Sequence, residues 1–294
     1  MSAGSKWSLT EPQKLTFDDP VSTLQVRVVG GTVNVVGTGT GPTRLELAEI
    51  DGPPLIVTHE EGVLRVGYDD VPWKGWLKWL DHKSWNRTVH LTLTVPTGTS
   101  ASIGAVGAGT VLSGLGGRTD VHGVTGDFTL VGLTGPVRAD TVSGRVEAQA
   151  VTGRLRFNSV SGDLTVIEGS GASVRADSVS GDILLDLAPV AAPGGADIAL
   201  TTVSGEIAIR LPHPADAEVE AHTTSGAVSN AFENLRVSGQ WGAKKISGRL
   251  GAGHGRLKAT TVSGAIALLR RPPTGEEDAA GPAQGPDRPE GKVL

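Results

Sequence analysis

The sequence predicts an all-β fold: a β-solenoid of the right-handed parallel β-helix type, preceded by a strand-rich hairpin region. Three observations predict it. Glycine accounts for 42 of the 294 residues, about twice the ordinary fraction, whereas aromatic residues make up only 4%. A glycine-marked repeat runs through the second half of the chain. Around each repeat glycine, apolar residues occupy alternate positions, which is the periodicity of a strand and not of a helix.

The repeat has a unit of nine residues, and two units make one coil. Ser or Thr directly precedes every second repeat glycine, and an apolar residue stands two places after it. These glycines are Gly126, Gly144, Gly162, Gly181, Gly205, Gly226, Gly248 and Gly264. Side chains alternate between the two faces of a strand, so a unit with an odd number of residues would turn the next unit to the opposite face. A bend in each unit restores the inward face, and Gly beside Ser favours such a bend. Coils of roughly 18 to 20 residues then stack about 4.8 Å apart. An antiparallel meander or sandwich is the alternative, because its strands have similar spacing.

Residues 15–108 are expected to form the N-terminal β region, which covers the open edge of the first coil. The pair Gly30-Gly31 lies between two alternating apolar runs and predicts a hairpin, and Glu60-Glu61-Gly62 predicts a second one. The solenoid is expected over 109–270. A flexible N-terminus over 1–14 and a disordered tail over 271–294 complete the predicted organisation.

A tryptophan-rich insertion over 71–87 interrupts the N-terminal region. It contains Trp73, Trp76, Trp79 and Trp85, with lysines between them. Three interpretations remain open for these side chains: a structural cap, a surface for a protein partner, and docking on an anionic membrane.

A column of polar residues stands four places before successive repeat glycines: His122, Asp140, Asn158 and Asp177. Stacked coils would place them in one row, about 4.8 Å apart. Such a row could bind a cation or a polar ligand. The alternative is an Asx-type turn repeated in each coil, with the side chains bonding the local backbone.

Composition excludes several classes of function. The chain has no Cys, which removes disulfides, thiol nucleophiles and sulfur-ligated zinc. Its net charge of −5 argues against a dedicated nucleic-acid-binding protein. The histidines show no metal-binding spacing and no hydrolase motif occurs, so we expect no metal, no cofactor and no catalysis. Without a signal peptide or a run of about 18 apolar residues, a cytoplasmic location is expected, with membrane association only through a partner.

The phrase Val160-Ser161-Gly162-Asp163-Leu164 returns over 179–183 and, with Glu in place of Asp, over 203–207. It resembles a bacterial family of β-strand-repeat proteins of unknown function, labelled "putative adhesins" and also called toast-rack domains. The resemblance covers roughly residues 24–269. It implies a β-helical domain with no known catalytic residues, from a family whose members often occur beside cell-envelope stress or membrane-associated proteins.

Together these features predict a non-enzymatic, adhesin-like interaction or scaffold module. Its partner would be an unidentified protein or a membrane-associated complex, and the ends of the solenoid would also permit self-association. The alternative is a carbohydrate-binding or carbohydrate-active β-helix protein. Catalysis of that kind needs clustered carboxylates in one groove, and only Asp140, Asn158 and Asp177 approach this.

Overall fold

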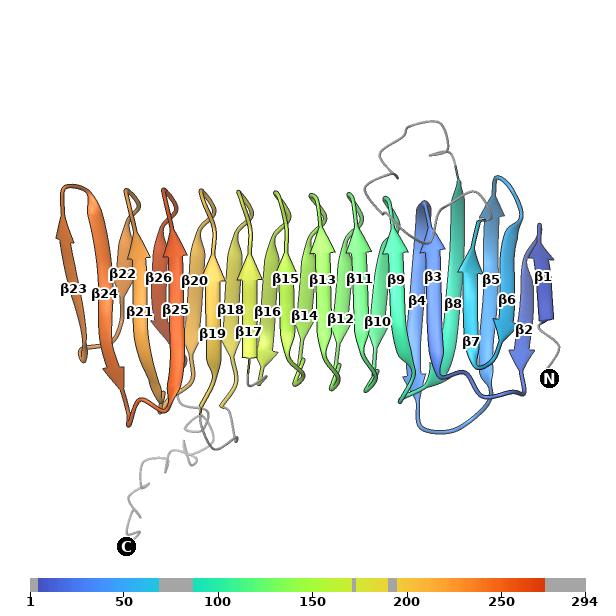
Figure 1. The fold of residues 1–294 in the computed structure, drawn as a ribbon, viewed down its shortest axis with the longest axis horizontal. Coiled ribbons are helices and arrows are strands. Elements are labelled where there is room, and N and C mark those ends of the chain that lie inside the picture. Colours follow the sequence, from blue (N-terminus) through green and yellow to red (C-terminus); the bar gives the residue numbers. More distant parts are fainter. Residues whose placement is uncertain (1–4, 69–86, 171–172, 190–194, 273–294) are drawn as a thin grey trace, which may run out of the picture.

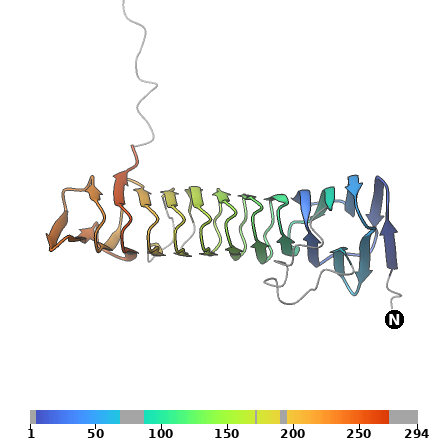
Figure 2. The ribbon, with the colours of Figure 1, turned by 90° about the horizontal axis from the view of Figure 1, so that it is seen from above.

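The computed structural model describes residues 5–68, 87–170, 173–189 and 195–272, which form two β-sheets lying face to face along the whole molecule (Figures 1 and 2). The first sheet has 14 strands, in the spatial order β1 (Ser5–Leu9), β6 (Leu55–Glu60), β7 (Val63–Gly67), β3 (Thr23–Val28), β9 (Ser100–Ala105), β11 (Thr119–Gly123), β13 (Val137–Thr141), β15 (Leu155–Asn158), β17 (Ser173–Asp177), β19 (Asp197–Thr201), β25 (Gly255–Thr261), β21 (Ala217–Thr223), β24 (Ala243–Leu250) and β23 (Leu235–Gln240). The second sheet has 12, in the order β2 (Gln13–Phe17), β5 (Thr43–Asp51), β8 (Thr88–Pro96), β4 (Gly30–Thr38), β10 (Gly109–Ser113), β12 (Phe128–Val131), β14 (Val146–Gln149), β16 (Leu164–Gly169), β18 (Ile183–Leu187), β20 (Ile207–Leu211), β26 (Ile266–Arg270) and β22 (Val228–Asn230).

Each central coil contributes one strand to each sheet, and equivalent strands of neighbouring coils pair in parallel. Thus β13 pairs with β15 in the first sheet, and β14 pairs with β16 in the second. The predicted β-solenoid is confirmed, in the form of a flattened coil with two strands. The antiparallel alternative is wrong for these central coils.

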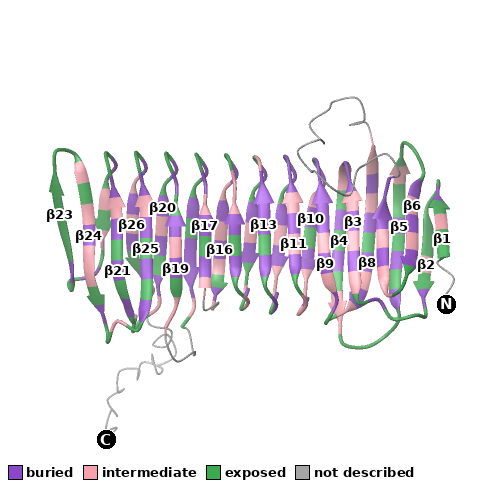
Figure 3. Ribbon diagram, in the orientation of Figure 1, coloured by how far each residue is buried: buried purple, intermediate pink, exposed green. Residues whose placement is uncertain are grey.

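The core lies between the two sheets and is built mainly from aliphatic side chains. Buried and exposed residues alternate along most strands, which gives the banding in Figure 3. Phe128 and Phe157 are the largest fully buried side chains, and most of the other core positions hold Val, Leu, Ile or Ala. Because the strand period is two, the alternate positions face solvent and carry the polar residues.

The repeat glycines lie at the turns that lead from the first sheet to the second, stacked one above another. A Cβ added at Gly144, Gly162 or Gly181 would collide with the carbonyl oxygen of the equivalent glycine in the preceding coil. At five of these turns, a Ser or Thr hydroxyl three places before the glycine accepts the glycine N–H, as Ser178 Oγ does for Gly181 at 3.0 Å. The predicted row of glycines is therefore present, and close backbone contact between coils requires it.

The N-terminal region continues the same two sheets, so no boundary separates it from the solenoid: β3 pairs in parallel with β9, and β4 with β10. The hairpin predicted at Gly30-Gly31 is wrong, because β3 and β4 lie in different sheets and this pair begins β4. The hairpin predicted around Glu61 is confirmed as β6–β7.

The flexible N-terminus predicted for residues 1–14 is also wrong over residues 5–14. Strands β1 and β2 pair antiparallel with β6 and β5, and β1 buries Leu9. Strands β1 and β2 are the edge strands of the two sheets at this end of the molecule (Figure 2).

The C-terminal coils depart from sequence order. Strand β25 inserts between β19 and β21, so the turn at Gly264 stacks directly on that at Gly205. Gly248, the seventh glycine of the predicted row, lies inside the antiparallel strand β24 and is not a turn residue. Of the tail predicted from residue 271, only Arg271 and Pro272 belong to the described residues.

Candidate functional site

The polar column predicted from the sequence forms one row across the outer face of the 14-stranded sheet. The register pairs His122 with Asp140, Asp140 with Asn158, and Asn158 with Asp177. The row then continues through Thr201, Thr260, His222 and Lys245. All four predicted residues lie in strands, so the alternative of repeated Asx-type turns is wrong. We call these four residues the polar ladder.

Asp140 is the centre of the ladder and is buried, with 8% of its surface exposed. Its Oδ2 accepts a hydrogen bond from Arg138 Nε at 2.8 Å and lies 3.4 Å from His122 Nδ1. Its Oδ1 accepts a hydrogen bond from Asn158 Nδ2 at 2.6 Å. Burial favours the neutral acid, but the contacts with His122, Arg138 and Asn158 outweigh it and hold the pKa of Asp140 well below its usual range. The group is a permanently ionised, fully occupied carboxylate at neutral pH.

Arginines form a second row on the same face, two residues before the polar ladder in β13, β15 and β17. Arg138, Arg156 and Arg175 are paired in register across β13, β15 and β17. Arg175 Nε lies 3.1 Å from the carboxylate of Asp177 in β17, and Arg118 Nε, directly before β11, lies 2.7 Å from that of Asp120. Each of these short pairs links positions i and i+2, which point to the same side of the sheet.

Two arginines on this face have no such partner. In β15 the residue two places after Arg156 is Asn158, an amide that offers no charge. Arg154 lies two residues before Arg156 and directly precedes β15. Both residues are exposed, and within the described parts of the chain neither forms an ion pair. We call Arg138, Arg154, Arg156 and Arg175 the arginine face.

The two outer faces of the molecule differ in charge. Over β11, β13, β15 and β17, the outward positions and those directly before the strands hold five Arg and three Asp, a net charge of +2 with His122 neutral. Over the matching strands β12, β14, β16 and β18, they hold one Arg and five acidic residues, a net charge of −4. The first face is therefore positive on a protein whose total is −5.

Sequence reasoning missed the arginine face although its signal was present. Arg138, Arg156 and Arg175 all stand six places before a repeat glycine, just as the polar ladder stands four places before. Both columns lie at even distances from the turn, and alternation places both on the outer face. The other predicted binding residues, Trp73, Trp76, Trp79 and Trp85, lie outside the described residues.

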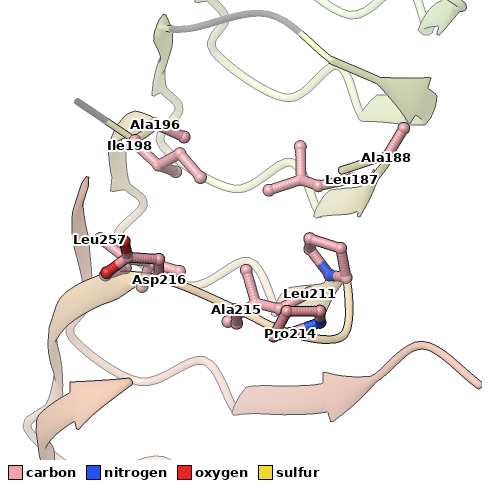
Figure 4. Close-up of a pocket in the computed structure, with 12 residues that line it drawn as sticks. Leu187, Ala188, Ala196, Ile198, Leu211, Pro214, Ala215, Asp216 and Leu257 are labelled. Carbon is pink, nitrogen blue, oxygen red and sulfur yellow. The ribbon is translucent and has the colours of Figure 1, made fainter. Parts of the chain in front are cut away.

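One small hollow elsewhere in the molecule is mainly apolar. A cavity of about 90 Å³ lies where the loops after β18 and β20 leave the coil (Figure 4), lined mainly by apolar side chains such as Leu187, Ile198 and Leu211. Asp216 is the charged residue of its lining, and its carboxylate accepts the backbone N–H groups of Gly253 and His254. Over the described ranges, no three His, Asp or Glu side chains are grouped to hold a metal ion. Nor does this part of the chain contain a helix that could cross a membrane.

Comparison with known proteins identifies a family for the repeat. Residues 125–269 match the model of a family described as Toastrack DUF4097. Among curated proteins, none matches the chain. A solved structure from Clostridium sporogenes ATCC 15579, described as a "putative cell adhesion protein", is 10% identical over 89% of this chain and 100% of its own, with a TM-score of 0.28. A "putative adhesin" from Bacteroides fragilis NCTC 9343 is 12% identical over 92% of this chain and 98% of its own, with a TM-score of 0.41.

Proposed function

The chain belongs, through residues 125–269, to the Toastrack DUF4097 family, and from this premise we propose a non-enzymatic, adhesin-like interaction module that binds an acidic partner through the arginine face. One observation carries the proposal. Each of the three Asp residues on the four central strands pairs with an Arg, and two further arginines, Arg154 and Arg156, remain without a counter-charge.

The geometry of this face suits a partner that carries several negative charges. Neighbouring strands are about 4.8 Å apart, so the guanidinium groups of Arg138, Arg156 and Arg175 recur at that interval along the molecule. Guanidinium groups bind carboxylates through two parallel hydrogen bonds, which adds orientation to attraction. The sheet below is hydrogen-bonded on both sides and fixes the backbone of these residues, so little order is lost on binding.

The polar ladder supports binding and not catalysis. A glycosidase acid must hold a proton near neutral pH, and its pKa is raised for that purpose. The pKa of Asp140 is displaced in the opposite direction, and both of its oxygens are engaged by neighbours. In this proposal the ladder holds the arginine face in place, with Asp140 fixing Arg138 and Asp177 fixing Arg175.

The test is binding of an acidic polymer, with polyglutamate as the probe, measured by isothermal titration calorimetry on the full chain. Removing the unpaired guanidinium groups in the double variant Arg154→Ala/Arg156→Ala should lower the affinity at least tenfold, because about 1.4 kcal/mol is lost with a charge-assisted contact. Affinity of the unaltered protein should also fall as salt rises.

The matched control is Arg145→Ala, which removes an exposed arginine from the opposite, acidic face. Affinity should be unchanged in this variant. Equal binding by the double variant and the unaltered protein would refute the proposal, and so would an equal loss in the control.

A carbohydrate-binding function is the second candidate, and the regular spacing of the arginines favours it. One cation in each of three consecutive coils suits a polymer whose charges repeat. Polygalacturonate in place of polyglutamate tests this candidate, with uncharged dextran as the control. Binding of polygalacturonate alone would assign the face to an acidic polysaccharide, and binding of polyglutamate alone would assign it to a protein partner.

A further inference from the structure

Strand β23 is the outermost strand of the 14-stranded sheet at the C-terminal end of the molecule (left in Figure 1). It pairs with β24 on one side only, and the second sheet already ends at β22, which has three residues. Val237, in the middle of β23, is 54% exposed. Long open edges are usually shortened, charged or interrupted by Pro, because they pair with other strands. Strand β23 has six residues and a single charge, on Arg236.

Trp241, at the tip of the β23–β24 hairpin, is the second unusual feature of this end. It is fully exposed, at 103%, and has a φ of 53°. The two-residue turn Trp241-Gly242 needs positive φ at both positions, and Asn-Gly is the preferred pair there. A bulky side chain is disfavoured in this conformation, and no packing within the molecule compensates. An exposed Trp held at a local cost is typical of a contact residue.

The hydrogen-bond pattern of the hairpin shows which backbone groups are available. Gln240 and Ala243 flank the two-residue turn and are paired, so they exchange both ladder hydrogen bonds. Such pairs alternate along the strand, and Val237 and Gly239 therefore direct their N–H and C=O groups away from β24. In agreement with this pattern, the N–H of Leu235 bonds Phe232 O and not β24.

We propose that β23 pairs with β23 of a second copy of this chain, antiparallel and centred on Ser238, so that the two 14-stranded sheets become continuous. This register places Val237 opposite Gly239, with all their free backbone groups paired. It places Trp241 opposite Leu235 and diagonal to the exposed Val237, where its ring covers apolar surface. Arg236 stands opposite Gln240, so no like charges face each other.

The N-terminal edge of a second copy fits β23 less well. Strand β1 has five residues, and its Trp7 already packs against Phe17 at a centroid distance of 5.3 Å. Pairing of β1 with β23 would also join copies head to tail without limit. Self-pairing of β23 is isologous and closes at two copies.

The association of the full chain is measured by sedimentation equilibrium over micromolar to millimolar concentrations, with small-angle X-ray scattering for shape. Fourteen strands span about 62 Å, so a dimer joined through β23 should have about twice the maximum dimension of the monomer. A monomer at all concentrations, a growing filament or a compact side-by-side dimer would each overturn the proposal.

Two variants separate association from folding. Trp241→Asn installs the residue that the turn prefers, so the dimer dissociation constant should rise at least tenfold while the melting temperature stays the same or rises. Val237→Pro removes an N–H that forms no bond to β24 and should have a similar effect on association. Val203→Ala, at a turn valine that is 46% exposed, is the matched control and should leave association unchanged. A dimer insensitive to both β23 variants would contradict the proposed pairing.

Discussion

Asp140 and its neighbours illustrate how the solenoid determines the chemistry of single residues. Its carboxylate contacts His122 from the preceding coil, Arg138 from its own strand and Asn158 from the following coil. These three partners lie 18, 2 and 18 residues away in sequence, and the stacking register brings them together. The polar ladder therefore acts as a clamp between coils as well as a support for the arginine face.

Replacement of Asp140 by Asn should destabilise the protein at pH 7 by about 2 kcal/mol, because Arg138 loses its charged acceptor and an amide replaces the carboxylate beside His122. The pKa of Asp140 is lowered by folding, so its stabilising effect is complete above about pH 5 and is lost as the pH falls below the ordinary value of about 3.9. Urea unfolding from pH 7 to pH 3 measures this. The slope of stability against pH should be smaller in the variant, and identical slopes would contradict the assignment.

Sequence reasoning succeeded for the polar ladder and failed for its partners. Aligning the chain on the repeat glycines is sufficient to place His122, Asp140, Asn158 and Asp177 in one row. The pairing of each acid with an arginine depends on the direction of both side chains within the strand. No acid stands two places after Arg156, and only the complete face shows that this arginine therefore lacks a counter-charge. Lys244 stands four places before Gly248, the position that the repeat assigns to the ladder, but the row passes through Lys245 because β24 runs antiparallel and sets its own register.

At the scale of elements, the turn between the two sheets is the unit that repeats. From Gly162 onward, the turn glycine donates its N–H to a Ser or Thr hydroxyl three places before it, as in Ser159 with Gly162 at 2.7 Å and Thr202 with Gly205 at 3.1 Å. The glycine itself lies against the carbonyl of the glycine in the coil below. The side-chain acceptor and the absence of a Cβ at the glycine together allow the chain to turn while neighbouring coils stay at the spacing of paired β-strands.

Gly181→Ala should therefore lower the free energy of unfolding by at least about 2 kcal/mol, because a Cβ at this position meets the backbone oxygen of Gly162 and neither atom can move freely. Denaturant unfolding followed by circular dichroism measures the change. Gly109→Ala is the control, since a Cβ at Gly109 meets nothing within 4 Å. Similar losses in the two variants would show that the glycine stack does not limit packing.

The order of the elements was only partly predictable. Glycine pairs serve both as hairpin turns and as bends between sheets, so Gly30-Gly31 does not reveal which strand β3 will join. Nor does local sequence indicate that β25 inserts before β21, because the repeat glycines Gly226 and Gly264 are equivalent in pattern. Long-range strand pairing decides both cases.

At the scale of the whole molecule, each coil contacts only its two neighbours, and antiparallel strands lie at both ends. The stability of such an array is approximately a sum of coil and interface contributions. The end strands β1 and β23 have one neighbour each in the sheet, whereas β13 and β15 have two. The ends should therefore open locally at a lower free energy than the centre.

Hydrogen exchange measured by mass spectrometry on the full chain tests this gradient. At low protein concentration, amides of β13–β16 should exchange most slowly and those of β1 and β23 most quickly, because opening an end breaks a single interface. Equal protection from end to end would instead show that the solenoid opens as one cooperative unit. Raising the concentration separates the two ends: if β23 pairs with its copy, exchange should slow at Val237 and Gly239, whose amides gain partners, and remain unchanged in β1.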